Sequence, residues 1–246
     1  MERPLSKHVA VVTGASRGIG RATALRLAEN GADVALIARD ATALESVARE
    51  VALHGTRPLV LEVDITDDIR LEEALQRAVV QLGSVSILVN GAGVAPPRTM
   101  HGKAAISEWD RMLATCLRAP MVLSRMLLPD MLVHQRGLVV NIASVAARRA
   151  RPGEAAYAAA KAGLLAFSHT LFREVRNSGV KVTAICPGYV DTEFIPENKK
   201  VDRGKFLRPE DVADVVVQVA LSPAQACPSE VILEPQFDPE VRTPAA

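Results

Sequence analysis

The chain has 246 residues, of which 49% are hydrophobic and 23% charged, and its formal net charge is +1. This length and composition suit one α/β domain with a sizeable core. The nearly neutral charge and the aromatic content of only 3% argue against nucleic-acid binding, which uses basic faces and base-stacking rings. Three scattered cysteines and five scattered histidines indicate neither a disulfide framework nor a metal site.

The first residues lack the long apolar stretch of a signal peptide, and no apolar run reaches the roughly 18 residues of a membrane span. We therefore expect no contact with a membrane and a cytoplasmic location.

Short apolar runs alternate along the chain with helical patterns. We expect strands over 8–14, 33–38, 58–64, 85–93, 137–144, 180–188 and 230–235. We expect helices over 18–29, 41–53, 107–135, 155–178 and 209–221, and one that ends near 82. The strand runs are continuous rather than alternating, which favours a parallel sheet covered on both faces. The order predicts a single domain over 1–246 with a Rossmann-type, doubly wound parallel sheet of about seven strands. The polar tail 236–246 is expected to be loose.

A glycine-rich turn, TGASRGIG (13–20), joins the first expected strand to the first helix. Glycines let the backbone turn tightly and approach a pyrophosphate, and the helix N-terminus then faces the anion. The spacing, Gly14-x-x-x-Gly18-x-Gly20, differs from the common G-x-G-x-x-G. Its place between strand and helix favours a dinucleotide site over a plain turn.

The alanine-rich segment 154–163 carries Tyr157 and Lys161 four residues apart. Helical geometry puts both side chains on one face. A nearby cation lowers the pKa of a tyrosine from about 10, so that its proton can move near neutral pH. The pair alone is common by chance, and a surface tyrosine beside a solvated lysine is the simpler interpretation. Other motifs in the chain are needed to distinguish a catalytic pair from this simpler interpretation.

Five motifs, in order and at the usual spacing, resemble the short-chain dehydrogenase/reductase family. They are T-G-x-x-x-G-I-G, N-G-A-G (90–93), Ser144, Tyr157-x-x-x-Lys161 and P-G-Y-V-D-T (187–192). The resemblance spans nearly the whole chain. It implies that Tyr157 is the general acid or base, that Lys161 lowers its pKa and holds the nicotinamide ribose, and that Ser144 binds the substrate oxygen. It also implies hydride transfer between a nicotinamide and a carbonyl or secondary alcohol.

The end of the second strand distinguishes the two nicotinamide cofactors. An acidic residue there would hold a ribose 2′-hydroxyl, whereas arginine suits a 2′-phosphate. Ala38 occupies the acidic position, Arg39 follows it, and Arg17 can reach the same region. We interpret Asp40 as a helix cap. The arrangement favours NADP(H), and a solvated Arg39 in a loop is the alternative.

The resemblance places further residues at the cofactor. Asp64 matches an adenine-contacting aspartate, Asn90 a fourth-strand asparagine, and Thr192 the threonine that meets the carboxamide. The remaining expected cofactor residues are Gly14, Ser16, Gly18, Ile19, Gly20, Ile65, Gly91, Ala92, Pro187, Gly188 and Val190.

Cys116 departs from the family pattern, which carries asparagine at this position. The carbonyl of that asparagine is thought to hold a water that relays protons to the lysine. Pro120, four residues later, lacks the N–H that would bond the carbonyl of Cys116 in a helix. We therefore expect this carbonyl to be free and the relay to survive with less precision. A redox-sensitive or nucleophilic thiol is the competing interpretation, although free cysteines on helices are usually inert.

Basic residues crowd the expected walls of the substrate cleft, 94–103, 145–153 and 189–207. They are Arg98, Arg148, Arg149, Arg151, Lys199, Lys200, Arg203 and Lys205. An anionic substrate or a carrier-bound thioester would suit such a rim. Scattered, solvated charges are the alternative.

Three functions remain open. The leading hypothesis is an NADPH-dependent carbonyl reductase or alcohol dehydrogenase that acts on a small molecule. A β-ketoacyl thioester reductase is the second. The third is an NADP-binding regulator whose catalysis is weakened because Cys116 replaces the asparagine. Family members usually pair through two long helices, so the resemblance also implies a homodimer or homotetramer through 107–135 and 155–178.

Overall fold

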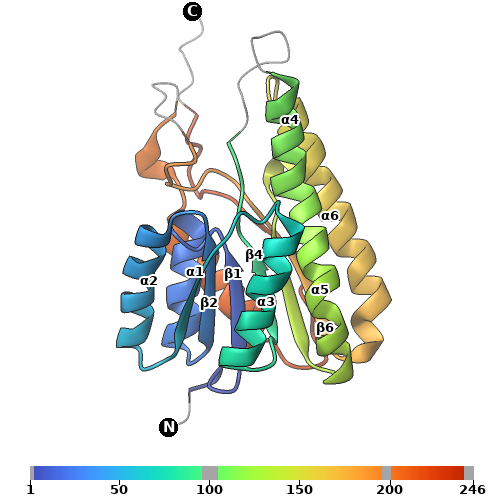
Figure 1. The fold of residues 1–246 in the computed structure, drawn as a ribbon. Coiled ribbons are helices and arrows are strands. Elements are labelled where there is room, and N and C mark those ends of the chain that lie inside the picture. The colour runs from blue at the N-terminus through green and yellow to red at the C-terminus, as the bar shows by residue number, and fades with distance from the viewer. Residues whose placement is uncertain (1–2, 96–104, 196–200, 241–246) are drawn as a thin grey trace, which may run out of the picture.

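Seven parallel strands form one sheet in the order β3-β2-β1-β4-β5-β6-β7 (Figure 1). The computed structural model describes residues 3–95, 105–195 and 201–240. The strands are β1 Val9–Thr13, β2 Asp33–Ala38, β3 Pro58–Glu62, β4 Ile87–Asn90, β5 Gly137–Ile142, β6 Val180–Pro187 and β7 Glu230–Leu233. The single-domain, doubly wound α/β fold is thereby confirmed.

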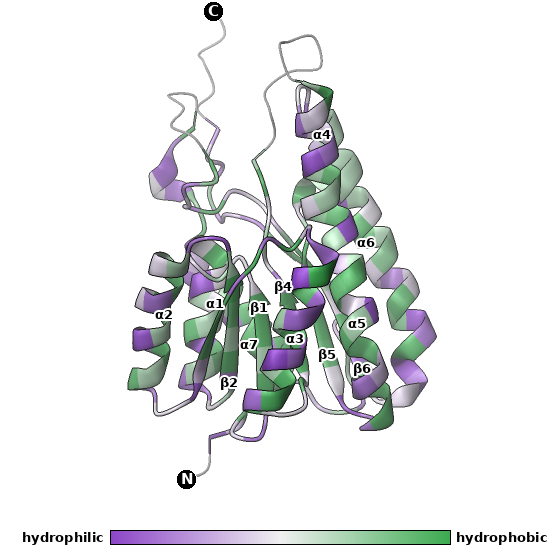
Figure 2. Ribbon diagram, viewed as in Figure 1, coloured by the Kyte–Doolittle hydropathy of each residue, from purple (hydrophilic) through white to green (hydrophobic). Residues whose placement is uncertain are grey.

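Helices cover both faces of the sheet (Figure 1). One face carries α1 Gly18–Glu29, α2 Ala41–Leu53 and α7 Pro209–Ala220. The other carries α3 Asp68–Leu82, α5 Ala119–Val133 and α6 Ala155–Val175. Figure 2 shows hydrophobic strands and hydrophilic outer helix faces, as this layering requires. None of the described helices combines the length and hydropathy needed to cross a membrane.

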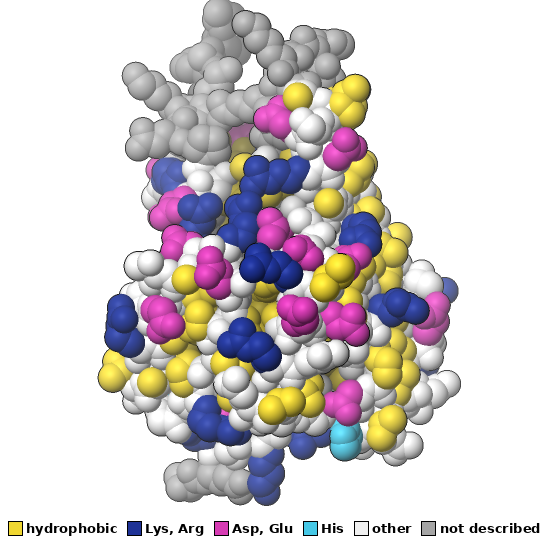
Figure 3. All heavy atoms as spheres, viewed as in Figure 1, with side chains coloured by type: hydrophobic (Ala, Val, Ile, Leu, Met, Phe, Trp, Pro, Cys, Tyr) yellow, Lys and Arg dark blue, Asp and Glu magenta, His cyan; other side chains and the backbone are white. Residues whose placement is uncertain are grey.

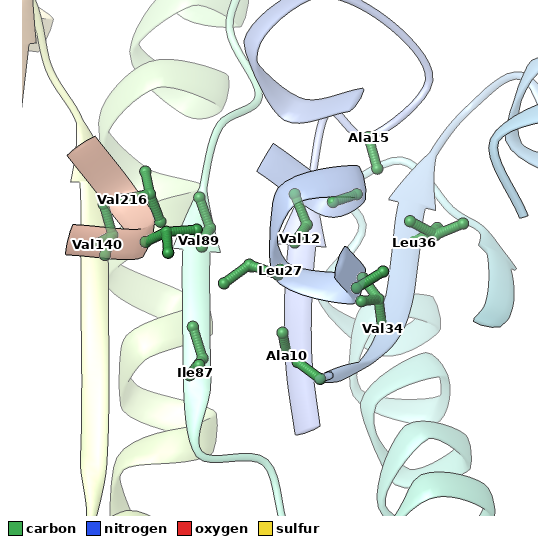
Figure 4. Packing of buried hydrophobic residues seen from close by; sticks show 14 of the residues in the cluster. Ala10, Val12, Ala15, Leu27, Val34, Leu36, Ile87, Val89, Val140 and Val216 are labelled. Atoms are coloured by element: carbon green, nitrogen blue, oxygen red, sulfur yellow. The ribbon is translucent and has the colours of Figure 1, made fainter. Parts of the chain in front are cut away.

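The core on the α1 and α7 side is built from small aliphatic side chains. Leu27 of α1 and Val216 of α7 lie over Val12, Val89 and Val140 of three neighbouring strands (Figure 4). All five are fully buried. Full burial of such a side chain contributes about 1.5–3 kcal/mol, so this packing fixes the strands and the loops at their carboxyl ends.

A chain of buried polar side chains ties β4 to α6. Asn90 Nδ2 donates to Asn141 Oδ1 at 2.8 Å, and Asn141 Nδ2 donates to Ser168 Oγ at 2.8 Å. The Ser168 hydroxyl donates in turn to the carbonyl of Leu164 at 2.7 Å. Since burying an unpaired amide is costly, the three side chains specify one position of α6 against the sheet.

The helix expected over 107–135 is not one continuous α-helix. It consists of α4 Ile106–Leu113, a π-helical turn Ala114–Arg118, and α5. The Ala119 N–H donates to the Ala114 carbonyl, five residues back. Pro120 explains the wider turn, because proline lacks an N–H and its ring clashes with the carbonyl four residues earlier.

The described part of the expected loose tail is paired with the segment before α7. Val201 forms an antiparallel bridge with Glu240, and the Asp202 N–H donates to the Pro239 carbonyl at 2.8 Å. Lys205 Nζ donates to the Asp238 carbonyl at 3.1 Å. These contacts hold residues 238–240 in place, which differs from the expectation. Residues 241–246 lie outside the described part of the chain.

A histidine next to β1 makes stability depend on pH. Burial, with a smaller effect of Arg136, lowers the pKa of His8 from 6.5 to about 4. Between about pH 6.5 and about pH 4 the unfolded chain therefore binds a proton that the folded chain rejects, so stability falls as the pH falls. We expect His8→Gln to lose less unfolding free energy than the unmodified chain between about pH 7.5 and about pH 5.

Urea denaturation at both pH values measures this difference. His134→Gln, whose side chain is 56% exposed, is the matched control. An equal pH dependence in the unmodified chain and His8→Gln would contradict the prediction.

Candidate functional site

A cavity of about 1400 Å³ lies at the carboxyl ends of the strands. It is lined by every expected cofactor residue except Asn90, and by Ser144, Tyr157 and Lys161. Cys116 and Asn90 lie behind this lining. Figure 3 shows Lys and Arg side chains among Asp and Glu on one face of the molecule, rather than a patch of one sign. The structure thus brings residues from distant parts of the chain to one site.

The glycine turn forms the floor of one end of the cavity. Gly14 and Gly18 have φ values of +69° and +53°, which favour glycine. A Cβ on Gly20 would lie 2.2 Å from the Gly14 carbonyl oxygen, so a side chain there would displace the turn. The helix α1 that follows has no side-chain cap at Arg17. Its first N–H groups are therefore available to an anion, as a pyrophosphate requires.

The end of β4 also suits a bound dinucleotide. The Thr13 hydroxyl accepts from the N–H groups of Gly91 and Ala92 at 3.1 and 3.2 Å, which holds this segment against β1. Asn90 Oδ1 is buried and has no hydrogen-bond partner among the described residues. An unpaired buried acceptor is costly, and Asn90 directly precedes Gly91 and Ala92, which line the cavity. The residues present therefore fit a dinucleotide.

The end of β2 has no free carboxylate at the described residues of the cavity. Asp40 accepts from the Ala43 N–H at 2.9 Å, which confirms it as a helix cap. Asp64 Oδ1 accepts from the Thr66 N–H and hydroxyl at 3.0 and 2.8 Å, and Arg39 lies 3.9 Å from Asp64 Oδ2. Partial burial opposes ionisation of Asp64, but the Thr66 hydrogen bonds and Arg39 together lower its pKa below the ordinary value.

Arg17 forms an ion pair that sequence reasoning missed. Its Nη1 lies 2.5 Å from Glu193 Oε2, which joins the glycine turn to the segment after β6. Both side chains are about 70% exposed, at 70% and 72%. An exposed ion pair contributes only about 0–1 kcal/mol to stability, so an anion with more charge than a carboxylate can replace Glu193 at Arg17.

Ser144, Tyr157 and Lys161 meet at the other end of the cavity. Ser144 follows β5, and its hydroxyl accepts from the Ala146 N–H at 3.1 Å. Tyr157 and Lys161 lie on the first turns of α6. Lys161 is buried, and its Nζ donates to the Ile142 carbonyl at 2.7 Å. The same Nζ lies 5.8 Å from the centroid of the Tyr157 ring.

The pKa of Tyr157 shifts in the direction opposite to the expectation. Burial raises the pKa of the phenol above its ordinary value, and a hydrogen bond with Ser144 opposes the shift only in part. Burial also lowers the pKa of Lys161. The net shift is therefore a rise and not the expected lowering, and the Lys161 ammonium is directed at the Ile142 carbonyl in the chain without a ligand.

Cys116 lies in the π-helical turn, fully buried against Met112, Ala160 and Tyr157. It is therefore beside the catalytic candidates but shielded from the cavity. A thiol in this position lacks the access that a nucleophile or redox sensor needs. The π-helical turn at 114–118 contains Cys116, and the bond from the Ala119 N–H to the Ala114 carbonyl departs from regular α-helical spacing. That the Cys116 carbonyl is free and supports a proton relay stays a prediction.

The basic rim is largely paired with carboxylates. The ion pairs are Arg148–Glu230, Arg149–Glu234, Arg151–Glu240, Arg203–Asp191 and Lys205–Asp202. Arg98, Lys199 and Lys200 lie outside the described residues. The described rim therefore does not supply the free positive charge that an anionic substrate would need.

Five acidic residues of the cavity were missed by sequence reasoning: Glu154, Glu193, Glu234, Asp238 and Glu240. Glu193 follows Thr192 directly, and Glu154 lies three residues before Tyr157. The helical spacing from Glu154 to Tyr157 is the signal that could have found it. The described residues contain no group of three or more His, Cys, Asp or Glu arranged to hold a metal ion.

Comparisons with known proteins agree with this geometry. Residues 8–202 match the family described as short chain dehydrogenase. A 3-oxoacyl-[acyl-carrier-protein] reductase of Synechocystis sp. is 31% identical over 90% of this chain and 92% of its own length. A glycine betaine reductase, ATRR, of Emericella nidulans is 36% identical over 96% of this chain, but the match spans only 19% of that protein.

A solved structure shares the whole fold. The metagenomic short-chain oxidoreductase crystallised in complex with NADP has a TM-score of 0.82 and 34% identity, over 95% of this chain and 99% of that one. The likeness supports a nicotinamide dinucleotide as the cofactor of the cavity.

The close contact at Gly20 predicts a loss of dinucleotide binding on substitution. We expect Gly20→Ala to raise the Kd for NADPH at least about tenfold, because the Cβ forces the turn away from the α1 N-terminus. Calorimetric titration with NADPH measures the Kd. Gly204→Ala is the control, since the atom near its Cβ is the end of the Asp202 side chain. Equal affinities in the two variants would refute the assigned role of the turn.

Proposed function

Because the chain belongs to the short-chain dehydrogenase family, we propose that it is an NADPH-dependent carbonyl reductase or alcohol dehydrogenase. The observation that carries this proposal is one cavity that joins the glycine turn to Ser144, Tyr157 and Lys161. A dinucleotide on the turn and a carbonyl at the phenol would share the same space. An oxidoreductase that uses a nicotinamide dinucleotide is the general class to which the family assigns it.

The state of Tyr157 suits reduction of a carbonyl. A bound nicotinamide supplies the hydride. The Tyr157 phenol, whose pKa burial raises above its ordinary value, is protonated at neutral pH and can donate its proton to the substrate oxygen. The hydroxyl of Ser144 donates a hydrogen bond to the same oxygen as negative charge develops. The nearby ammonium of Lys161 stabilises the phenolate that remains.

NADPH is the proposed cofactor because the cavity offers arginine where NADH would need an acid. Ala38 leaves the end of β2 without a carboxylate, and Asp40 is used as a cap. Arg39 and Arg17 both line the cavity, each in a weak, exposed ion pair. The NADP complex of the metagenomic relative supports this preference.

A β-ketoacyl thioester reductase is the second candidate, and the Synechocystis relative supports it. The paired arginines of the described rim give it less support. The Emericella relative makes a carbonyl compound with an ammonium group a reasonable test substrate. A regulator without catalysis is disfavoured, because the trio stays together in the cavity despite Cys116.

The homodimer or homotetramer through the two long helices stays a prediction. Exposed apolar side chains on α4 and α5, namely Ile106, Leu113 and Met121, are consistent with it. The cytoplasmic location also stays a prediction.

Loss of the Tyr157 hydroxyl should stop turnover. We expect Tyr157→Phe to reduce kcat at least about 100-fold on any carbonyl that the unmodified enzyme reduces, because general acid catalysis is removed. NADPH oxidation with small ketones, diketones and β-ketoacyl thioesters is the measurement. Tyr189→Phe, in the same cavity, is the control and should lose less than about tenfold. Undiminished turnover in Tyr157→Phe would refute the mechanism, and NADPH binding without any turnover would favour the regulator.

Removing Arg39 should weaken the preference for NADPH. We expect Arg39→Ala to lower kcat/KM for NADPH at least about tenfold relative to that for NADH, because the 2′-phosphate loses its cation. Arg49→Ala, an exposed change of equal charge on α2, is the control. The ratio of the two kcat/KM values is the measurement. An unchanged ratio would show that Arg39 is only a solvated loop residue.

A further inference from the structure

Glu154 is a carboxylate in the cavity without an evident structural role. It occupies the N-cap position of α6, three residues before Tyr157, and it lines the cavity. Its side chain makes no capping hydrogen bond to the helix. The N-cap position favours the short side chains of Ser, Thr, Asp and Asn, so glutamate here is not explained by helix stability.

Glu154 is distinct from the other carboxylates of the cavity. Six further acidic residues line it: Asp40, Asp64, Glu193, Glu234, Asp238 and Glu240. Each accepts a hydrogen bond or forms an ion pair. Among the cavity's described residues, Glu154 alone has a carboxylate with neither. Glu154 is therefore left out of the ion pairs and hydrogen bonds that neutralise the other carboxylates of the cavity.

The surroundings of Glu154 leave negative charge in excess. Arg151 is the cation that acts on it, but Arg151 lies 2.9 Å from Glu240 and 4.7 Å from the centre of the Tyr189 ring. Two carboxylates thus share one guanidinium. Lys161 is buried and directed at the Ile142 carbonyl. Burial raises the pKa of Glu154, and Arg151 compensates only in part.

Aromatic rings line the same cavity. The ring centroids of Tyr157 and Phe194 are 5.9 Å apart, and both residues face the cavity. The faces of such rings attract cations and tolerate the methyl groups of an alkylated ammonium. A carboxylate and aromatic rings together favour a cation over a neutral or anionic group.

We propose that Glu154 selects carbonyl substrates that carry a positively charged ammonium group. This inference rests on the reductase function proposed above. The ammonium supplies the countercharge that Glu154 lacks, while the carbonyl of the same molecule lies at Tyr157. Glu154 takes no part in the proton or hydride transfer and acts on binding alone.

A pair of ketones of equal shape tests the proposal. The probe is 1-(trimethylammonio)propan-2-one, and its neutral isostere is 4,4-dimethylpentan-2-one. We expect the enzyme to favour the cation at least about tenfold in kcat/KM, and we expect Glu154→Gln to reduce this preference at least about fivefold. The ratio cancels any effect of Glu154 on the Tyr157 proton, because both ketones use the same step. Glu45→Gln, an exposed change of equal charge on α2, should keep the preference.

Calorimetric binding of both ketones to the protein loaded with NADP⁺, which holds no hydride to transfer, gives the same comparison without turnover. A preference for the neutral ketone, or an equal preference in the unmodified enzyme and Glu154→Gln, would overturn the inference. Reduction of the neutral ketone would then leave the proposed function intact. Selective binding of the cation with no reduction of any carbonyl would instead support the selectivity and overturn the reductase.

Discussion

The hydrogen bonds from Asn90 through Asn141 to Ser168 are the constraint on which the site depends. They connect the end of β4, where a dinucleotide would meet the sheet, to the helix that carries Tyr157 and Lys161. Apolar packing alone permits small sliding of a helix over a sheet. Buried amides do not, because each displaced donor or acceptor is left unpaired. The distance between the end of β4 and the helix that carries Tyr157 is thereby built into the core.

Desolvation sets the chemistry at the reacting end. It raises the pKa of the Tyr157 phenol and lowers the pKa of the Lys161 ammonium. The spacing alone suggests that Lys161 lowers the pKa of Tyr157, but in the chain without its ligands the ammonium is directed at the Ile142 carbonyl and the pKa of the phenol rises. Around the rim, charge attraction matters more than burial, because exposed arginines and carboxylates form ion pairs that neutralise one another. The cavity therefore combines the buried phenol of Tyr157 with an entrance at which positive and negative charges nearly balance.

Most of the fold was predictable because the strands are mostly apolar runs, and because glycine and helix-capping residues mark the turns between elements. The glycine turn and the Tyr157 helix were found from spacing and family resemblance, and the structure brings them together. Ion pairs such as Arg17–Glu193 were not predictable, because they join residues far apart in the sequence. The direction of the Tyr157 pKa was missed for a related reason. Burial depends on tertiary packing, whereas the spacing to Lys161 is local.

The π-helical turn at 114–118 changes the phase of the long helix. Such a turn is equivalent to an α-helix with one residue inserted, and each residue turns the helix by about 100°. Side chains in α5 therefore face directions that a regular helix continued from α4 would not give them. A heptad or helical-wheel projection drawn through the whole segment assigns the outer face of one half incorrectly. Any comparison of surface residues along this segment must treat α4 and α5 as two helices with separate phases.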